Sequence, residues 1–188
     1  MLFEQCQSIT TLMNQFNKHW FVAGGWAIDL YLGKETREHN DLEIALLRKD
    51  QLNLKAYLNE WDFKKVVKGE LYIWGDEFLE LPIHEIHASN SLTENHLEIL
   101  LNETKDNYWI FRRDTRISLP IDLIWRISNT GIPYLTPEIV LLYKARHTRE
   151  KDHQDFHTIK DYLQYEQKQW LRAALELHEP NHTWIQFL

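Results

Sequence analysis

The hydrophobic positions in the first third of the chain change from one periodicity to another. Between residues 9 and 16 they recur at helical spacing, whereas the runs at 20–23 and 42–47 are short and apolar, as in buried strands. A Gly-Gly pair follows the first run, and Gly33 follows the next apolar stretch, where glycine commonly ends a helix. This region predicts strands over 20–23 and 42–47 and helices over 9–16, 26–32 and 50–59, the last with Asp50 as its N-cap.

From residue 63 to about residue 132 the pattern becomes extended. Short apolar or aromatic runs between turn residues predict strands at 66–67, 71–74, 97–101 and 108–111, with a polar hairpin loop over 102–107. Beyond that the pattern is helical. Thr136, Pro137 and Glu138 form a typical helix start, and further helices are predicted over 152–163 and 166–177. The predicted fold class is α/β, with a mixed sheet flanked by helices and followed by C-terminal helices.

The change of pattern near 120–132 divides the chain into two predicted parts. Residues 1–130 are predicted to form the main core with the mixed sheet, and residues 131–188 a C-terminal helical segment that closes a cleft. A chain of 188 residues is long enough for one domain of this kind. We therefore expect the two parts to make a single compact unit.

Composition narrows the classes of function. The formal net charge of −7 argues against a general nucleic-acid binder, which normally carries a basic face. No apolar run is long enough to span a membrane. A single cysteine, Cys6, excludes an internal disulfide and fits a reducing, cytoplasmic location. The sequence still offers a local basic patch for phosphates, formed by Lys144, Arg146, Arg149 and Lys151.

The residues most informative about chemistry are two glycines and two carboxylates. Gly24 and Gly25 make a turn in which no Cβ prevents backbone N–H groups from approaching a phosphate. Asp41 and Glu43 alternate with apolar residues, so on a strand both carboxylates project from one face. Paired carboxylate oxygens suit Mg²⁺, which also binds waters and substrate phosphates. The set indicates nucleotidyl transfer.

The same stretch resembles the nucleotidyltransferase superfamily. Its pattern is a glycine pair, a short helix and a strand with D-x-[DE]. Here GGWAID is followed by TREH and then by DLE, which resembles the branch of aminoglycoside and lincosamide nucleotidyltransferases. The likeness continues through WIFRRDTRI and GIPYLTPEIVLLYKARHTREKD, so it covers most of the chain.

This resemblance implies a reaction and its participants. A nucleoside monophosphate, AMP from ATP, would pass to a hydroxyl of a small-molecule acceptor, with two Mg²⁺ ions bound by Asp41, Glu43 and a third carboxylate. Glu98 is the favoured third carboxylate, with a Glu where relatives carry Asp, and Glu85 is the alternative. Gly24 and Gly25 would hold the phosphates of ATP or another nucleoside triphosphate. Arg37 would steady the loop or contact a phosphate, and Lys144 would bind the triphosphate.

Other interpretations of the same residues stay open. Asp29 is interpreted as a brace for the helix after the glycine turn, and His39 as a weaker candidate than Arg37. His153 and His157 lie one helical turn apart, but no third metal ligand has convincing spacing, so surface histidines are favoured. A non-catalytic nucleotide-binding or antitoxin-like module is one alternative function. A HEPN-like ribonuclease, suggested by the R-x6-H spacing of Arg146 and His153, is another.

Overall fold

The computed structural model describes residues 2–93 and 95–188. Helices, 3-10 turns (η) and strands succeed one another in the order α1 (Glu4–Leu12), β1 (Trp20–Val22), α2 (Gly24–Leu32), β2 (Glu43–Leu47), η1 (Arg48–Asp50), α3 (Gln51–Tyr57), β3 (Asp62–Val67), β4 (Glu70–Ile73), β5 (Glu85–Asn90), β6 (Asn95–Lys105), β7 (Tyr108–Ile110), β8 (Ser118–Pro120), η2 (Ile121–Leu123), β9 (Trp125–Ile127), β10 (Pro133–Leu135), α4 (Pro137–Lys144), α5 (Glu150–Ile159), α6 (Tyr165–His178) and η3 (Thr183–Phe187).

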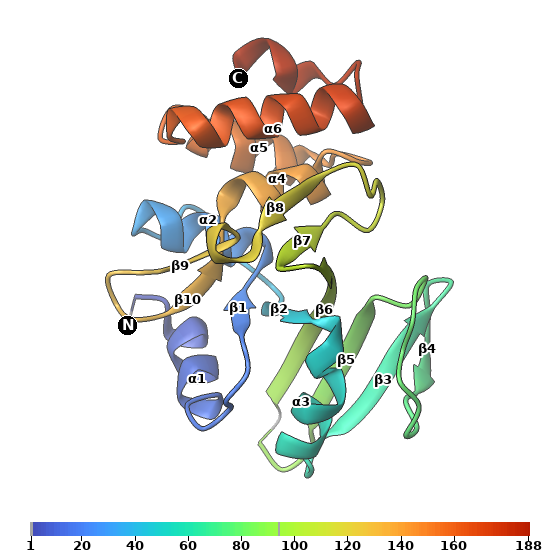
Figure 1. Ribbon diagram of the computed structural model, residues 1–188. Helices are drawn as coiled ribbons and strands as arrows, with labels where there is room; N and C mark the ends of the chain where they lie inside the picture. Colours follow the sequence, from blue (N-terminus) through green and yellow to red (C-terminus); the bar gives the residue numbers. More distant parts are fainter. Residues whose placement is uncertain (1, 94) are drawn as a thin grey trace.

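One mixed sheet organises the molecule. Its strand order is β4-β3-β5-β6-β2-β1-β10-β9, and β7 pairs with β6 and with β8. The pairs β2–β6 and β1–β10 are parallel, and the other pairs are antiparallel. Helices α4, α5 and α6 stack at one end of the molecule, whereas α1 and α3 lie toward the other end (Figure 1). The predicted α/β class, a mixed sheet with helices and C-terminal helices, is confirmed.

The turn between β1 and α2 depends on glycine. Gly24 has a φ of 60° and is the first residue of α2, so this helix begins at the glycine pair and not after it. The helix ends as predicted at Gly33, which is left-handed with a φ of 71°. Glycine adopts such angles without the steric cost that a Cβ imposes. Both ends of the helix are therefore fixed by the local sequence.

Two parts of the extended region differ from the sequence prediction. The predicted loop over 102–107 is wrong, because β6 continues to Lys105 and only Asp106 and Asn107 form the turn, with φ of 51° and 64°. Asn102 is accommodated inside the sheet, where its side chain accepts a hydrogen bond from Trp109 Nε1 at 2.9 Å. Strand β5 was not predicted from the sequence, and it lies between β3 and β6. Asn102 illustrates that a buried polar residue with a hydrogen-bond partner fits a strand as well as an apolar residue does.

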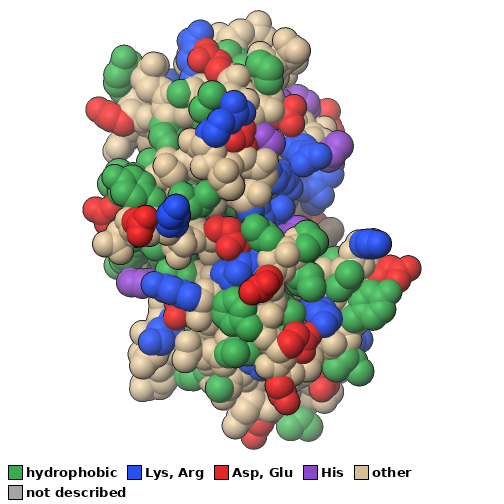
Figure 2. Space-filling view, turned by 45° about the vertical axis from the view of Figure 1, so that its right-hand side comes forward, with side chains coloured by type: hydrophobic (Ala, Val, Ile, Leu, Met, Phe, Trp, Pro, Cys, Tyr) green, Lys and Arg blue, Asp and Glu red, His purple; other side chains and the backbone are tan. Residues whose placement is uncertain are grey.

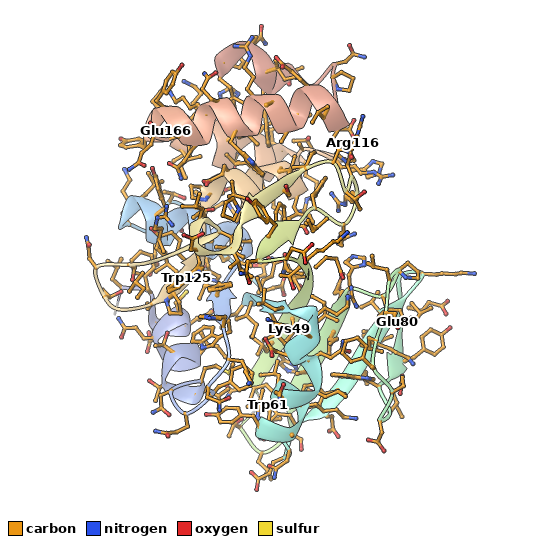
Figure 3. The ribbon with its side chains drawn as sticks, in the orientation of Figure 1. Lys49, Trp61, Glu80, Arg116, Trp125 and Glu166 are labelled. Carbon is orange, nitrogen blue, oxygen red and sulfur yellow. The ribbon has the colours of Figure 1, made fainter. Side chains whose placement is uncertain are left out.

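Aromatic side chains serve packing in much of the molecule. Trp125 of β9 stacks on Phe21 of β1 with ring centroids 5.4 Å apart (Figure 3). Arg116, in the turn between β7 and β8, donates to Asp114 and to the backbone oxygen of Leu177 at the end of α6 (Figure 3). These contacts attach the outer strands and the last long helix to the core.

Residues beyond 130 contribute to the same sheet. Strand β10 pairs with β1, and α4 packs against α2, so one hydrophobic core includes both predicted parts. The division into 1–130 and 131–188 stays a prediction. Asp50 and Thr136 occupy the predicted N-cap positions, but neither side chain makes a cap hydrogen bond. None of the helices among the described residues has the length and apolar character needed to cross a membrane.

Candidate active site

The glycine turn lies directly against a carboxylate of the neighbouring strand. Ala23 N donates to the Glu43 backbone oxygen at 2.8 Å, which aligns the start of α2 with the start of β2. A Cβ added to Gly24 would lie 1.5 Å from Glu43 Oε2. At Gly25 a Cβ would meet Arg37 Nη2 at 2.4 Å and the His39 ring. Both glycines are needed because charged side chains from other segments occupy the space beside them.

The structure brings the expected carboxylates together on one face of the sheet. Glu43 of β2 is directly opposite Glu98 of β6 in a parallel register, so both side chains project to the same side. Neighbouring strands are about 4.8 Å apart. Asp41 lies two residues before Glu43, in the segment that enters β2, and is exposed. The three carboxylates therefore form one acidic group at the edge of the glycine turn.

Burial and mutual repulsion disfavour ionisation of this group. Burial raises the pKa of Glu43, and the negative charge of Asp41 raises it further, while Lys144 acts in the opposite direction. Burial likewise raises the pKa of Glu98, with Glu43 as the next cause. Among the described residues, no hydrogen bond or ion pair reaches the carboxylates of Asp41, Glu43 or Glu98. Such a group is stabilised by a bound cation.

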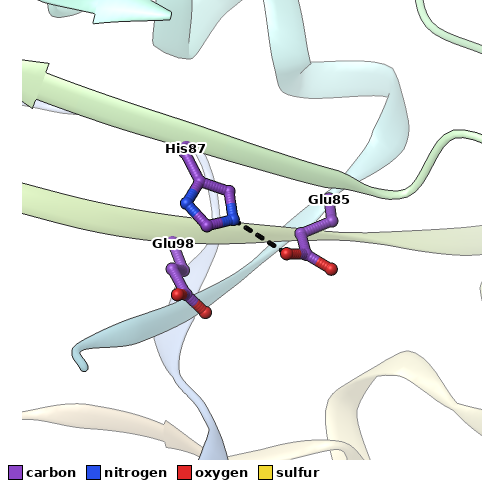
Figure 4. A group of neighbouring side chains, drawn as sticks. All are labelled: Glu85, His87 and Glu98. Carbon is purple, nitrogen blue, oxygen red and sulfur yellow. Dashed lines mark hydrogen bonds and ion pairs between the residues drawn. The ribbon is translucent and has the colours of Figure 1, made fainter. Parts of the chain in front are cut away.

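The alternative third carboxylate, Glu85, lies in the same neighbourhood. Glu85, His87 and Glu98 each offer a ligand atom, and these atoms all lie within 4.8 Å of one another (Figure 4). His87 Nε2 and Glu85 Oε1 are 2.8 Å apart. In the register, His87 is opposite Glu98, and Glu85 is two residues along β5 from His87. Glu98 is thus the direct neighbour of Glu43, and Glu85 is one strand farther away.

These carboxylates separate two cavities. Glu43, Glu85 and Gly24 line a cleft of about 420 Å³, whereas Asp41, His87 and Glu98 line a second cavity beside it. Five basic side chains also line the cleft, those of Arg112, Arg113, Lys144, Arg146 and Arg149. Figure 2 shows Lys and Arg side chains gathered beside histidines at the junction of the helical end and the sheet. A chain with net negative charge therefore concentrates cations at this cleft.

Lys144 faces the cleft, but its ammonium group is not free. Lys144 Nζ donates to Asp152 Oδ1 at 2.8 Å and is 3.0 Å from Asp155 Oδ2, and 10% of the side chain is exposed. Arg149 Nε also donates to Asp152, at 2.9 Å. Burial alone would raise the pKa of Asp152, but hydrogen bonds from Arg149 and Lys144 outweigh it and lower the pKa to about 2. Lys144 is thus part of a buried ion-pair network.

Arg37 belongs to the same network. Its Nε and Nη2 donate to the two oxygens of Asp155 at 2.8 and 3.0 Å, and its Nη1 donates to the Glu38 backbone oxygen. This bidentate pair attaches the loop after α2 to α5. In the structure Arg37 steadies the loop and does not point its guanidinium into open space.

Asp29 anchors the other side of that loop. The side chain is fully buried and accepts hydrogen bonds from Thr36 N at 3.1 Å and Thr36 Oγ1 at 2.5 Å. Its Oδ2 is also 2.7 Å from His39 Nε2. Asp29 is therefore a brace for the loop over 36–39, and not for the helix α2 as the sequence analysis had interpreted it.

Two arginines in the cleft had no role in the sequence analysis. Arg112 and Arg113 both lie over the Tyr143 ring, each 5.4 Å from its centroid, and Arg113 also donates to the Tyr143 backbone oxygen at 2.8 Å. Burial lowers the pKa of both guanidinium groups. Arg112 makes no hydrogen bond or ion pair with the described residues. The FRRD segment was the available signal, but its spacing does not reveal that α4 supplies the facing ring.

The histidines of α5 do not form a metal site. His153 Nδ1 accepts a hydrogen bond from Trp184 Nε1 at 3.1 Å, and the His157 ring packs against Phe187. Among the described residues, the group of Glu85, His87 and Glu98 is the one with three convergent ligand atoms. The packing of His153 accounts for its position without ribonuclease chemistry.

Comparison with known proteins decides the family. The family model described as aminoglycoside-2''-adenylyltransferase matches residues 5–159. The chain belongs to this family. It is accordingly an enzyme of the nucleotidyltransferase class, as the resemblance in the sequence indicated, and the ribonuclease alternative is not supported. No curated protein sequence is similar enough to match the chain.

Solved structures share the fold at low sequence identity. The lincosamide antibiotic adenylyltransferase LnuA, solved with lincomycin bound, is 19% identical with a TM-score of 0.60, over 86% of this chain and 99% of LnuA. ANT(2'')-Ia, solved with adenylyl-2''-tobramycin, is 17% identical with a TM-score of 0.62, over 92% and 97% of the two chains. A nucleotidyltransferase-like protein of Thermotoga maritima is 14% identical with a TM-score of 0.52, over 87% and 97%.

Proposed function

We propose that this enzyme transfers AMP from ATP to a hydroxyl group of a small molecule of the aminoglycoside or lincosamide kind. The observation that carries the proposal is the acidic group of Asp41, Glu43 and Glu98 beside the Gly24 turn, with Glu43 lining the same cleft as a set of basic side chains. A nucleoside triphosphate needs both features, since its phosphates require cations and close backbone approach. The family assignment and the antibiotic complexes of LnuA and ANT(2'')-Ia support the acceptor class.

The residues present fit two divalent cations. Asp41, Glu43 and Glu98 supply hard oxygen ligands, the pKa of Glu43 and Glu98 is raised by burial, and no cation among the described residues forms an ion pair with them. Asp41 and Glu43 would hold both ions, and Glu98 would hold the ion nearer the acceptor. When bound, Mg²⁺ would neutralise charge on the phosphates.

The chain's own residues divide the remaining work. The backbone at Gly24 and Gly25 holds the β- and γ-phosphates, and Arg112, which makes no hydrogen bond or ion pair with the described residues, supplies a positive charge in the cleft. Glu98 takes the proton of the acceptor hydroxyl. The hydroxyl oxygen then attacks the α-phosphorus in line, the bond to the bridging oxygen breaks, and pyrophosphate leaves.

Lys144 contributes to phosphate binding through its position in the ion-pair network. Its ammonium group lies in the cleft wall, and its positive charge opposes the rise in the pKa of Glu43. The electrostatic field of Lys144 therefore reaches this carboxylate. Asp152 and Asp155 hold it there. A lysine kept in place in this way loses little conformational entropy when a phosphate binds.

The test is transfer of label from nucleotide to acceptor. The purified enzyme is incubated with Mg²⁺, each of the four α-³²P-labelled nucleoside triphosphates, and panels of aminoglycosides and lincosamides. We expect acceptor-dependent labelling with ATP and release of pyrophosphate. Asp41→Asn is the control, since it replaces a metal-binding carboxylate by an amide of nearly equal size and should abolish transfer without unfolding the protein. Tight ATP binding without pyrophosphate release in the presence of any acceptor would instead support the non-catalytic alternative.

A further inference from the structure

A histidine joins two carboxylates beside the proposed magnesium ligands. Glu85 and His87 of β5 and Glu98 of β6 each offer one ligand atom, and these atoms all lie within 4.8 Å of one another. Figure 4 shows the three side chains gathered around a common space. His87 has no role in the proposed transfer reaction. Its ring nitrogen gives this group a ligand chemistry that the all-oxygen pair of Asp41 and Glu43 lacks.

The sheet itself holds the three side chains in place. β5 and β6 pair antiparallel, with His87 directly opposite Glu98, and both strands have neighbours on each side. Glu85 and His87 are two residues apart on one strand, so their side chains leave the same face of the sheet. Directly opposite residues on one face have Cβ atoms about 4.5–5.5 Å apart. The convergence of the group is therefore fixed by strand register and needs no loop to become ordered.

Small side-chain movements would turn the group into a coordination shell. Bonds of about 2.0–2.2 Å from Zn²⁺ to imidazole nitrogen and carboxylate oxygen place neighbouring ligand atoms of a tetrahedral ion about 3.3 Å apart. The separations in the structure lie on both sides of this value, since His87 Nε2 and Glu85 Oε1 are 2.8 Å apart and no pair exceeds 4.8 Å. The side chains of His87 and Glu85 are 34% and 32% exposed, so packing leaves them room to adjust. His87 and Glu98 also line the second cavity, from which water can complete the shell.

The ligand types select the class of metal ion. Imidazole nitrogen suits Zn²⁺ and other divalent ions of the first transition row, whereas Mg²⁺ prefers oxygen ligands. Two carboxylates and a neutral imidazole also balance the charge of one divalent cation. Lys64 lies opposite His87 on β3, but it is exposed, so its ammonium group can remain in solvent. The group therefore favours a transition metal over magnesium.

We propose that Glu85, His87 and Glu98 bind a divalent transition-metal ion of the zinc type, and that this ion inhibits the enzyme. Glu98 is shared between the two groups, because it is opposite His87 on β5 and opposite Glu43 on β2. A Glu98 carboxylate that coordinates zinc is no longer available to the second magnesium ion or to the acceptor proton. The binding site stands on geometry alone, and the inhibition rests on the proposed function.

Equilibrium dialysis tests the site without nucleotide or acceptor. The full chain, treated with a chelator, is dialysed against Zn²⁺ in an excess of Mg²⁺. We expect one Zn²⁺ per chain that the Mg²⁺ does not displace. Loss of a group that only supports a metal ligand typically weakens binding 10–100-fold, so His87→Gln and Glu85→Gln should each raise the Kd at least about tenfold. Circular dichroism and the Tm without metal show that each variant is folded.

His96→Gln is the matched control. His96 lies two residues from Glu98 on β6 and lines the same cavity, but it does not belong to the converging group. This variant should bind Zn²⁺ as the wild type does. Asp41→Asn separates the two metal sites, since it removes a proposed magnesium ligand and should leave the zinc affinity unchanged. In ¹⁵N spectra of the histidine rings, Zn²⁺ should shift the Nε2 signal of His87 and leave that of His96 in place.

The label-transfer assay then measures inhibition. Zn²⁺ should inhibit the wild type and His96→Gln at the same concentration, whereas His87→Gln should need at least about ten times more. A chelator that binds zinc more tightly than magnesium should restore transfer. If no acceptor is labelled under any condition, the proposed function fails, and dialysis and the ring spectra still decide whether the metal site exists.

Three binding results would overturn the site. The first is a wild-type chain that binds no stoichiometric Zn²⁺, and the second is a His87→Gln variant with wild-type zinc affinity. The third is displacement of Zn²⁺ by Mg²⁺ together with its loss in Asp41→Asn, which would assign the ion to the magnesium ligands. Full transfer activity with zinc bound would overturn the competition for Glu98.

Discussion

At the scale of single residues, the notable charges of the site are those without an ion pair among the described residues. The carboxylates of Asp41, Glu43 and Glu98 and the guanidinium of Arg112 lack ion pairs among the described residues, while Arg37 and Lys144 are bound by Asp155 and Asp152. Unpaired charges in a partly buried cleft are energetically unfavourable until a ligand of opposite sign binds. They mark where the metal ions and the phosphates are expected.

Glu43→Gln tests the metal-binding carboxylate. We expect loss of transfer, because a neutral amide binds Mg²⁺ poorly, while the free energy of unfolding without metal stays the same or rises by about 1 kcal/mol as repulsion from Asp41 is relieved. Thermal unfolding with and without Mg²⁺ and ATP measures both effects. Metal-dependent stabilisation that persists in the variant would contradict the assignment.

Arg112→Gln tests the unpartnered cation. Loss of a hydrogen bond to a charged phosphate should weaken ATP binding by about 1.5–3 kcal/mol, which is at least a tenfold increase in Kd by calorimetry. The protein should lose little stability, since Arg112 has no ion pair to break. Arg116→Gln is the control, because its guanidinium is held by Asp114 and Leu177 outside the cleft. Equal ATP affinity in Arg112→Gln and the wild type would reject the role.

At the scale of elements, the start of α2 joins backbone geometry to the site. Gly24 combines a φ of 60° with a Cβ position only 1.5 Å from Glu43 Oε2. Position 24 therefore requires glycine for two reasons. One is the positive φ angle, and the other is the carboxylate that occupies the place of a Cβ. Helix, turn and strand β2 form one rigid unit for this reason.

Gly24→Ala should disturb this unit. We expect a loss of at least about 1 kcal/mol of stability from the left-handed angle, and a larger loss of activity because Glu43 must move. Gly33→Ala is the matched control, since Gly33 has a φ of 71° but nothing lies within 4 Å of its Cβ position. The control should lose stability and keep activity. Urea denaturation and the transfer assay together separate the two outcomes.

At the scale of the whole molecule, a buried ion-pair network joins distant segments. Arg37 from the loop after α2, Lys144 from α4, and Asp152 and Asp155 from α5 meet beside the cleft. If Lys144 were an exposed lysine on the surface of α4, Lys144→Ala would leave the Tm almost unchanged. The network changes that expectation, because removing Lys144 leaves two buried carboxylates with one cation fewer, so the Tm should fall as well as the ATP affinity.

Asp152 gives this network a pH dependence. Its pKa is about 2 in the folded protein, below the value near 3.9 of an unfolded chain. The stabilisation from its ionised form is complete above about pH 4 and is lost as the pH falls toward 2, a change of about 2 kcal/mol. Asp152→Asn should therefore destabilise the protein by about 2–4 kcal/mol near neutral pH and by about half as much near pH 3. Urea denaturation at both pH values measures the difference, and an equal cost at both would contradict it.

The sequence by itself determined most of the local secondary structure and the class of reaction. Glycine spacing, the alternation at Asp41 and Glu43, and the Thr136-Pro137 helix start depend on neighbouring residues, so they could be read from the chain. Strand β5 and the far end of β6 were missed, because Asn102 reads as a loop residue until Trp109 supplies its hydrogen bond. The sequence likewise did not reveal the ion-pair partners of Arg37 and Lys144, which are supplied by helix α5.

Only the tertiary structure decided which charges are paired and which are free. Asp155 lies 118 residues from Arg37, and no local pattern records their bidentate contact. The parallel register of β2 with β6 sets Glu98 beside Glu43, and the position of α4 brings Tyr143 under Arg112. Pairing across such distances depends on how the sheet and the C-terminal helices pack. Local sequence therefore supplied the groups that we propose to be catalytic, and long-range packing determined their electrostatic surroundings.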